Sequence, residues 1–221
     1  MAAANKHLTH LEDRIILDGP KGGMDAIALL KEMGDLLTGK PGLNIGLTTK
    51  WDGAPAVVCG YDPADGQFFV GTKSVFAKDP KICKTESDVQ KFYNGVLAQK
   101  LSTALRYLPS SVKRGILQGD LMFTDDKKTE TIDGRRYITF RPNTITYAAN
   151  PKTKLGKEIN QAKIGIVFHT KYTGTNMSNL QASFKVDESD FRTGGNVWAE
   201  RATFTDISGI ANFSMAEKST Y

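Results

Sequence analysis

The stretch from Asn44 to Gly60, N-I-G-L-T-T-K-W-D-G-A-P-A-V-V-C-G, constrains the fold of this chain more than any other stretch. Apolar, β-rich runs at Asn44–Leu47 and Ala56–Cys59 flank a polar turn that contains Lys50. This pattern predicts two strands with a tight connection. Apolar strands around Lys50 would partly desolvate its ammonium and so favour the neutral amine, which is the nucleophilic form. Gly53 lacks a Cβ and would let backbone approach a phosphate closely.

The four residues of that turn resemble a known signature. Lys50-Trp51-Asp52-Gly53 looks like the K-x-D-G motif of the covalent nucleotidyltransferases, which comprise ATP-dependent DNA ligases, RNA ligases and mRNA capping enzymes. In that superfamily the lysine attacks the α-phosphate of a nucleotide and forms a lysyl-nucleotide intermediate. Four residues also occur together by chance, and Asp-Gly suits the turn of an ordinary hairpin. A polar hairpin with a chance motif is therefore an alternative interpretation.

A second stretch, Gly115–Phe123, favours the nucleotidyltransferase interpretation. It is an apolar strand with Gly119-Asp120 in its middle, and a carboxylate there must face a cavity or a partner because burying a bare charge is costly. It resembles motif III of the superfamily, which implies that Asp120 contacts the nucleotide ribose or a metal-bound water, although the family usually has Glu. Roughly 70 residues separate Asp120 from Lys50, a spacing that suits two strands meeting across one site.

Two further site residues follow from the same resemblance. Lys73, just after the strand predicted at Gln67–Val70, matches a cation that contacts the nucleotide phosphate or the incoming strand. Phe168, in the strong apolar strand Lys163–Tyr172, resembles the motif IIIa ring that stacks on the purine. His169 then stands where the family often has an acidic residue. An ordinary core phenylalanine is the alternative for Phe168.

The turn itself completes the predicted site. Lys50 would be the nucleophile, and Asp52 would orient it or serve the ribose or metal side. Thr49, Trp51 and Gly53 are predicted to bind the cofactor, which the resemblance implies to be ATP. Mg²⁺ is the implied metal, because it would offset phosphate charge in the transition state. The implied function is polynucleotide ligation or end joining, with DNA or RNA ends as the partner.

The resemblance and the hydrophobic pattern together predict an α+β fold, with antiparallel sheets that form a nucleotide-binding cleft and with flanking helices. Apolar residues at helical spacing predict helices over Met24–Leu37 and Asp88–Leu108, and Asp18–Gly23 reads as a loop. Asp125–Arg136 is predicted to be a charged loop, and Pro151–Ala162 a helix or a crossing loop. Shorter elements are a hairpin turn at Tyr61–Gly66 and strands at Tyr137–Phe140, Thr144–Ala148, Ala182–Val186, Val197–Phe204 and Ile210–Phe213.

Composition limits the class of protein. A chain of 221 residues suffices for one large domain or two small ones, and we expect a single nucleotidyltransferase domain over residues 1–221 and a monomer. No apolar run approaches the roughly 18 residues of a membrane span, and no signal peptide is recognisable, so we expect a cytoplasmic protein, in the host bacterium if the gene is from a phage. Cys59 and Cys83 lack metal-like spacing and are expected to be reduced. A net charge of +5 permits a polyanionic partner.

Two other clusters allow more than one interpretation. Arg135, Arg136 and Arg141, interleaved with Tyr137 and Phe140, suit a nucleic-acid backbone and stacked bases, but also a solvated edge hairpin. Near the N-terminus, two histidines followed by two carboxylates are possible metal ligands, but no third cluster of ligands is visible in the sequence and the carboxylates fit a solvated helical turn better. These residues are His7, His10, Glu12 and Asp13.

Two motifs of the superfamily are missing. No Glu-Gly dipeptide supplies motif IV, and no K-x-K pair on a strand follows Phe168 as motif V. The chain is then the N-terminal part of a longer protein, or it has replaced these motifs, or it keeps the fold without catalysis. We prefer the first explanation; the third predicts a nucleotide- or nucleic-acid-binding or virion-associated phage protein. His7–Asp13 together with Lys50–Pro55 also resembles uncharacterised ligase-like proteins of tailed phages.

Overall fold

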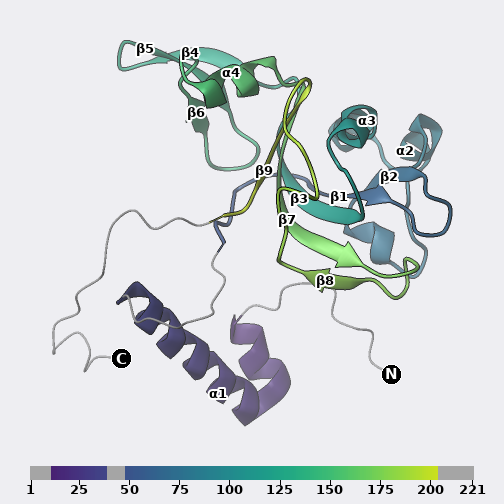
Figure 1. Cartoon of the computed structure of the whole chain (residues 1–221), viewed down its shortest axis with the longest axis vertical. Helices are drawn as coiled ribbons and strands as arrows, with labels where there is room; N and C mark the ends of the chain where they lie inside the picture. The colour runs from purple at the N-terminus through teal and green to yellow at the C-terminus, as the bar shows by residue number, and fades with distance from the viewer. Residues whose placement is uncertain (1–10, 39–47, 204–221) are drawn as a thin grey trace. The chain divides into compact units, whose positions relative to one another are not determined.

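The chain divides into two compact units (Figure 1). The computed structural model describes residues 11–38 and 48–203. The first unit comprises Met1–Thr49 with Thr203–Tyr221, and the second is Lys50–Ala202. One domain was predicted over the whole chain, whereas both predicted nucleotidyltransferase motifs fall within the second unit.

The described part of the first unit consists mainly of one long helix, α1 (Leu11–Leu37), which is interrupted at Gly19. Gly19 has φ 58° and ψ −137°, a conformation that favours glycine, and Pro20 follows where a new helical segment begins. The helix predicted over Met24–Leu37 is confirmed. The loop predicted over Asp18–Gly23 is wrong apart from Gly19 itself, because the chain re-enters the helix immediately after that residue.

Several sequence predictions fall outside the described residues. They are the histidines His7 and His10 and the strands at Asn44–Leu47 and Ile210–Phe213. Among the residues that are described, no helix combines the length and the apolar character required to cross a membrane.

The second unit is built on a six-stranded sheet with the order β2-β1-β3-β7-β8, to which β9 adds by pairing with β7. All pairs are antiparallel except β7 with β9. The α+β class with antiparallel sheets is therefore confirmed. The strands are β1 (Ala56–Tyr61), β2 (Phe68–Gly71), β3 (Ile116–Phe123), β7 (Ile164–Thr173), β8 (Gln181–Ser183) and β9 (Val197–Arg201).

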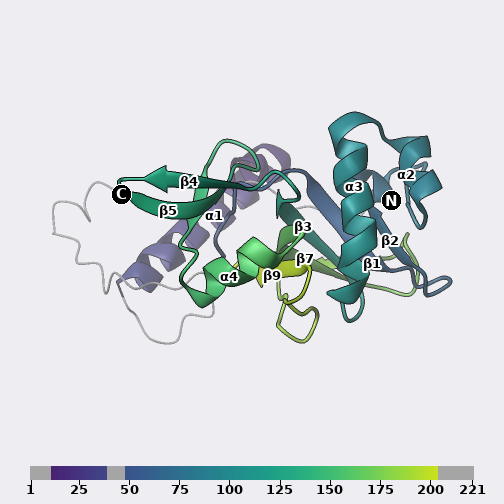
Figure 2. The ribbon, with the colours of Figure 1, turned by 90° about the horizontal axis from the view of Figure 1, so that it is seen from above.

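Two helices cover one face of this sheet, and Figures 1 and 2 show them on the same side of it. A single helix was predicted over Asp88–Leu108, but the structure has a break at Tyr93, and Asn94 is the N-cap of the next helix. Gly95 there has φ 57°, a conformation that glycine adopts without strain. The helices of the second unit are α2 (Glu86–Phe92), α3 (Gly95–Tyr107), α4 (Lys154–Gln161) and the short 3₁₀ helices η1 (Lys73–Phe76) and η2 (Leu108–Ser110).

Side chains alternate between the two faces of the sheet, which gives it two separate sets of buried residues. Val57, Leu117 and Phe168 point toward α2 and α3 and belong to the largest core cluster. Their neighbours Val58 and Ile116 belong to a different cluster on the opposite face. The polar residues of β3 lie on that second face, which α2 and α3 leave uncovered.

A smaller sheet of three strands has the order β4-β5-β6. Its strands are β4 (Lys128–Ile132), β5 (Arg135–Phe140) and β6 (Tyr147–Ala149). The prediction of a loop over Asp125–Arg136 is wrong, because these residues include all of β4 and the turn that follows it. Every side chain of β4 is exposed, so no apolar alternation marks the strand in the sequence. Asp133 (φ 49°) and Gly134 (φ 74°) form the turn, as Asp-Gly does in two-residue hairpins.

The two sheets share one hydrophobic cluster. Met122 and Trp198 of the large sheet pack with Ile138 and Phe140 of the small sheet and with Ile159 of α4. This contact fixes the small sheet beside the end of β3 that carries Asp120.

Candidate active site

The turn that carries Lys50 packs directly against β3. Ala54 N–H donates to the Leu121 carbonyl (2.9 Å), and Leu121 N–H donates to the Pro55 carbonyl (3.1 Å). A Cβ on Gly53 would lie 2.5 Å from the Asp120 Cβ, closer than real Cβ contacts allow. Only glycine fits at position 53 without a shift, so the K-x-D-G turn and the motif III-like strand are in contact.

Lys50 is exposed at the start of this turn. Within the described residues its ammonium makes no hydrogen bond or ion pair. The turn after it is held by backbone hydrogen bonds, so the side chain extends from a fixed support into solvent. The expectation that apolar strands partly desolvate the Lys50 ammonium is therefore wrong, because the side chain is exposed.

Asp52 anchors the turn to the segment before β6. Its carboxylate accepts hydrogen bonds from Asn143 Nδ2 (2.8 Å), Thr144 N (2.7 Å), Thr144 Oγ1 (2.6 Å) and Ile145 N (2.7 Å). The bonds from Thr144, Ile145 and Asn143 lower the pKa of Asp52 far below its ordinary value. Its own N–H donates to Tyr147 Oη (2.9 Å). Both carboxylate oxygens are thus engaged by protein donors, and the predicted role toward Lys50, ribose or metal stays a prediction.

Trp51 belongs to the aromatic cluster under the turn. Its ring stacks on Tyr147 with centroids 5.4 Å apart and meets Trp198 edge-on at 6.3 Å. Its indole Nε1 is buried and has no hydrogen-bond partner among the described residues. Trp51 therefore fixes the turn from below, which gives it a packing role beside the predicted role in cofactor binding.

Asp120 lies on the face of the sheet opposite α3, with its side chain 22% exposed. His169 Nε2 is 3.8 Å from Asp120 Oδ1, and His169 Nδ1 is 2.8 Å from Thr170 Oγ1. The register of β3 and β7 shifts here, since Gln118 pairs with Thr170 and Gly119 with Phe168. His169 is the extra residue of this β-bulge, a device that re-aims a side chain within a sheet. Asp120, His169 and Thr170 therefore form a polar strip along this face, close to the turn that carries Lys50.

Lys100 is a site residue that the sequence analysis missed. Its Nζ donates to the Ala54 carbonyl (3.3 Å) and lies 3.6 Å from Asp126 Oδ2, with the side chain 16% exposed. It thereby holds the turn from the side of α3. The sequence does carry a signal, because Lys100 falls at helical spacing from Leu97 and Ala104 and so interrupts the apolar face of α3.

Phe168 and Lys73 are not brought together with this turn, whereas Thr49 directly precedes Lys50 in the chain. Phe168 is fully buried and packs on Phe191 with ring centroids 5.2 Å apart, so its ring has no exposed face for a purine and we leave it out of the site. Lys73 is exposed at the start of η1, and no hydrogen bond or ion pair of the described residues joins it to the turn. Thr49 belongs to the first unit, where its Oγ1 donates to the Thr203 carbonyl (2.7 Å).

The predicted nucleic-acid patch is only partly available. Arg135, Arg136 and Arg141 are exposed, whereas Phe140 is buried and stacks on Tyr147 at 5.4 Å. The expectation that Phe140 stacks on bases is therefore wrong, because its ring is part of the core that joins the two sheets.

Metal ligands are sparse in the described ranges. They hold no group of three or more His, Cys, Asp or Glu side chains that could bind a metal ion. Asp120 has His169 beside it, with Nε2 at 3.8 Å from Oδ1. Such a site could hold Mg²⁺ only together with oxygen atoms of a bound phosphate or water, as is common for this ion.

Comparison with known proteins identifies one family. The model of a family of unknown function, DUF6267, matches residues 5–221. No curated protein and no solved structure matches the chain. Since the family model covers nearly the whole sequence, the chain belongs to the DUF6267 family.

Proposed function

We propose that this protein is an ATP-dependent nucleotidyltransferase of the polynucleotide ligase type, with Lys50 as the residue that accepts the nucleotide. The packing of Gly53 against Asp120 carries the proposal. It joins two stretches that resemble the K-x-D-G motif and motif III, and it leaves Lys50 exposed on a fixed turn. An accessible amine on a rigid support suits covalent catalysis, because little motion has to be frozen when the substrate binds.

The proposed reaction uses the neutral amine of Lys50. Its nitrogen attacks the α-phosphorus of ATP, a P–N bond forms, and the bond from that phosphorus to the oxygen bridging to the β-phosphate breaks. Pyrophosphate leaves, and the proton of the amine passes to solvent. Asp120 would bind Mg²⁺ jointly with phosphate oxygens. The phosphoramide then conserves the energy for transfer of the nucleotide to a nucleic-acid end.

The proposed second substrate is a DNA or RNA end, bound by a monomer of this chain. Arg135 and Arg136 at the start of β5 and Arg141 after it are exposed and can contact a phosphate backbone. The small sheet that carries them adjoins the turn through Asp52 and the residues that its carboxylate binds.

Labelling with α-³²P-ATP and Mg²⁺, followed by denaturing electrophoresis, tests the proposal. Label should stay on the wild-type chain and on Lys157→Ala, an exposed lysine of α4. It should be absent from Lys50→Ala and from Lys50→Arg, which keeps the charge without the amine. Label that persists in both Lys50 variants would overturn the assignment of the nucleophile.

A second candidate is a catalytically inactive nucleotide- or nucleic-acid-binding protein, including a virion-associated one. The observation that favours it is the full engagement of the Asp52 carboxylate by Asn143, Thr144 and Ile145. This candidate predicts no covalent label, but a thermal shift with ATP if it binds a nucleotide or with an oligonucleotide if it binds nucleic acid. Absence of the label and of both shifts would exclude both candidates.

A further inference from the structure

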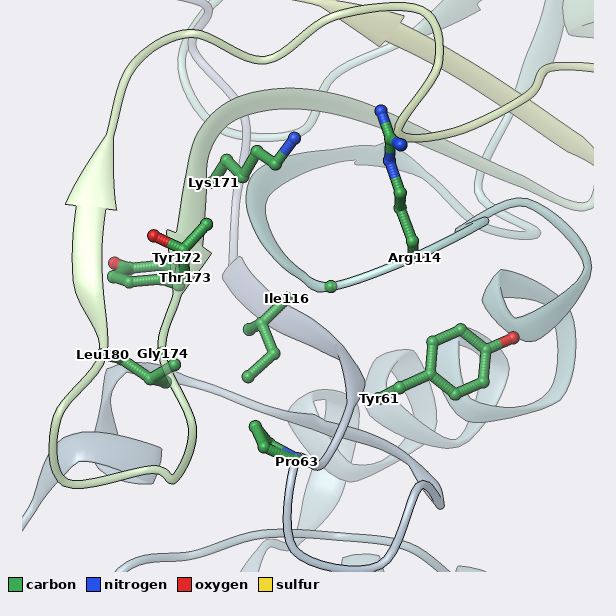
Figure 3. A pocket seen from close by; sticks show the side chains of 10 residues that line it. Tyr61, Pro63, Arg114, Ile116, Lys171, Tyr172, Thr173, Gly174 and Leu180 are labelled. Atoms are coloured by element: carbon green, nitrogen blue, oxygen red, sulfur yellow. The ribbon is translucent and has the colours of Figure 1, made fainter.

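An open hollow of about 280 Å³ lies at the opposite end of β3 from Asp120 (Figure 3). The end of β1, the start of β3 and the end of β7 surround it. Ile116 is four residues from Asp120, which is about 13 Å along a strand, so the hollow is separate from the turn that carries Lys50.

One rim of the hollow carries two cations. Figure 3 shows the side chains of Arg114 and Lys171 on this rim, with Lys171 directed toward Arg114. Both contact the same oxygen of Asp190: Arg114 Nε lies 3.3 Å and Lys171 Nζ 2.5 Å from Oδ1. Asp190 is fully buried, and its Oδ2 accepts a bond from Asp187 N (3.1 Å). The three side chains together carry one excess positive charge, which is partly offset by the Asp187 carboxylate, whose pKa is lowered chiefly by hydrogen bonds from Ser189 and also by Lys171 and Arg114.

The two cations keep hydrogen-bonding capacity. Arg114 has five N–H donors, and within the described residues only Nε and one terminal nitrogen are used, the latter by the Ser189 hydroxyl. Lys171 has three donors and uses one on Asp190. Asp190 already shows how one oxyanion bridges both side chains. A second oxyanion at the rim can use the remaining donors.

The rest of the hollow is mainly apolar. Tyr61, Pro63, Ile116 and Leu180 contribute rings and aliphatic groups, and they lie on the side away from the cations in Figure 3. Ligand pockets for drug-sized molecules span roughly 300–1,000 Å³, so a hollow of about 280 Å³ suits a molecule with a single ring.

We propose that this hollow binds a small organic anion, with a phosphate or carboxylate group at Arg114 and Lys171 and a ring-sized apolar body against Tyr61, Ile116 and Leu180. The guanidinium of Arg114 can bind the oxyanion through two N–H groups, and the ammonium of Lys171 binds it as a compact charge. The apolar wall buries the body of the ligand. This site does not depend on Lys50 or on ATP. It gives the protein a second ligand, independent of the proposed nucleotidyl transfer.

Titration of the ¹⁵N-labelled full chain tests this site, with phenyl phosphate, benzoate, inorganic phosphate and benzyl alcohol as probes. Phenyl phosphate or benzoate should shift the amide signals of Gly115, Thr173 and Gly174 saturably. The tighter of the two identifies the anionic group. Inorganic phosphate should bind more weakly because it lacks the apolar body, and benzyl alcohol because it lacks the charge.

Variants decide whether the shifts come from the proposed contacts. Arg114→Gln should weaken binding of the tighter probe roughly tenfold, the loss expected for a charged hydrogen bond. Arg114→Lys should retain part of the affinity. Arg106→Gln, the same change of charge at an exposed position of α3, should leave affinity unchanged. Equal binding by wild type and Arg114→Gln, equal binding of benzyl alcohol, or no saturation would each overturn the proposal. Thermal unfolding of each variant separates lost binding from lost folding.

Discussion

The two ends of β3 hold their cations in opposite ways. At the Asp120 end, Lys50 is exposed and makes no ion pair within the described residues. At the other end, Arg114 and Lys171 share the buried carboxylate of Asp190. The first arrangement leaves a nitrogen accessible to a substrate. The second fixes two charges in position, which suits binding of an anion without chemistry. One strand thus supports two kinds of site.

The largest effect in this comparison should come from Asp190→Asn. It leaves Lys171, whose side chain is 21% exposed, and the exposed Arg114 without their shared buried carboxylate, which should lower the free energy of unfolding by about 3 kcal/mol. Urea denaturation at pH 7 measures the loss. Glu188→Gln, an exposed change in the same loop, should cost less than about 0.5 kcal/mol. If the two variants are equally stable, Asp190 does not hold the two cations.

Gly53→Ala should have the next largest effect. The added Cβ would lie 2.5 Å from the Asp120 Cβ and 3.0 Å from the Leu121 carbonyl oxygen, so the turn must move away from β3. We expect a loss of about 2 kcal/mol, typical of overpacking, and loss of the ATP label. In Gly34→Ala the new Cβ meets nothing within 4 Å, and stability should be unchanged or slightly higher. A stable, fully labelled Gly53→Ala would contradict the close contact between the two motifs.

Asp52→Asn should change how stability depends on pH. Side-chain and backbone hydrogen bonds, chiefly from Thr144, lower the pKa of Asp52 in the folded chain, so its stabilisation is complete above the unfolded pKa of about 3.9. It is lost as the pH falls toward the lower folded value. The difference in free energy of unfolding between wild type and Asp52→Asn should be constant above about pH 5 and shrink below about pH 4.

A pH series of urea denaturations measures this difference. Asp79→Asn provides the control, since Asp79 is exposed and makes no hydrogen bond or ion pair in the described part of the chain. The free energy of unfolding of Asp79→Asn should differ little from that of wild type at every pH. An Asp52→Asn difference that does not shrink in acid would show that Thr144 and Ile145 do not stabilise the carboxylate form.

Lys100→Met should have the smallest effect on stability, below about 1 kcal/mol, because its bond to the Ala54 carbonyl is long at 3.3 Å. If Lys100 positions the turn, the rate of labelling should fall several-fold while the free energy of unfolding hardly changes. Lys100→Arg should restore most of the rate. Parallel losses of rate and stability in both variants would indicate a purely structural role.

Sequence patterns located most of the large sheet. The strands that were located are long or flanked by turn signals, and they are rich in apolar residues because they are buried in the sheet. They are β1, β2, β3 and β7. The strand β4 was missed because its side chains are all exposed. The break at Tyr93 was missed because apolar residues continue on both sides of it, although Asn94-Gly95 is a helix-start signal that outweighs them.

The candidate site was predictable in its residues but not in their contacts. Lys50, Gly53 and Asp120 were chosen from local motifs, and the structure places Gly53 on Asp120. Phe168 was chosen from a similar local pattern and lies in the core instead. A strand's sequence shows alternation but does not show which of its two faces a helix will cover.

The sequence by itself determined the α+β class, the strand that follows Lys50 and the acid in the middle of β3, because these depend on local periodicity and turn chemistry. Tertiary structure alone decided that Asp52 binds Thr144 and that Lys100 reaches the Ala54 carbonyl. It also decided that Arg114 and Lys171 meet at Asp190. These contacts join residues far apart in the chain, and their geometry depends on sheet register and helix placement, which only the packing of the whole unit sets.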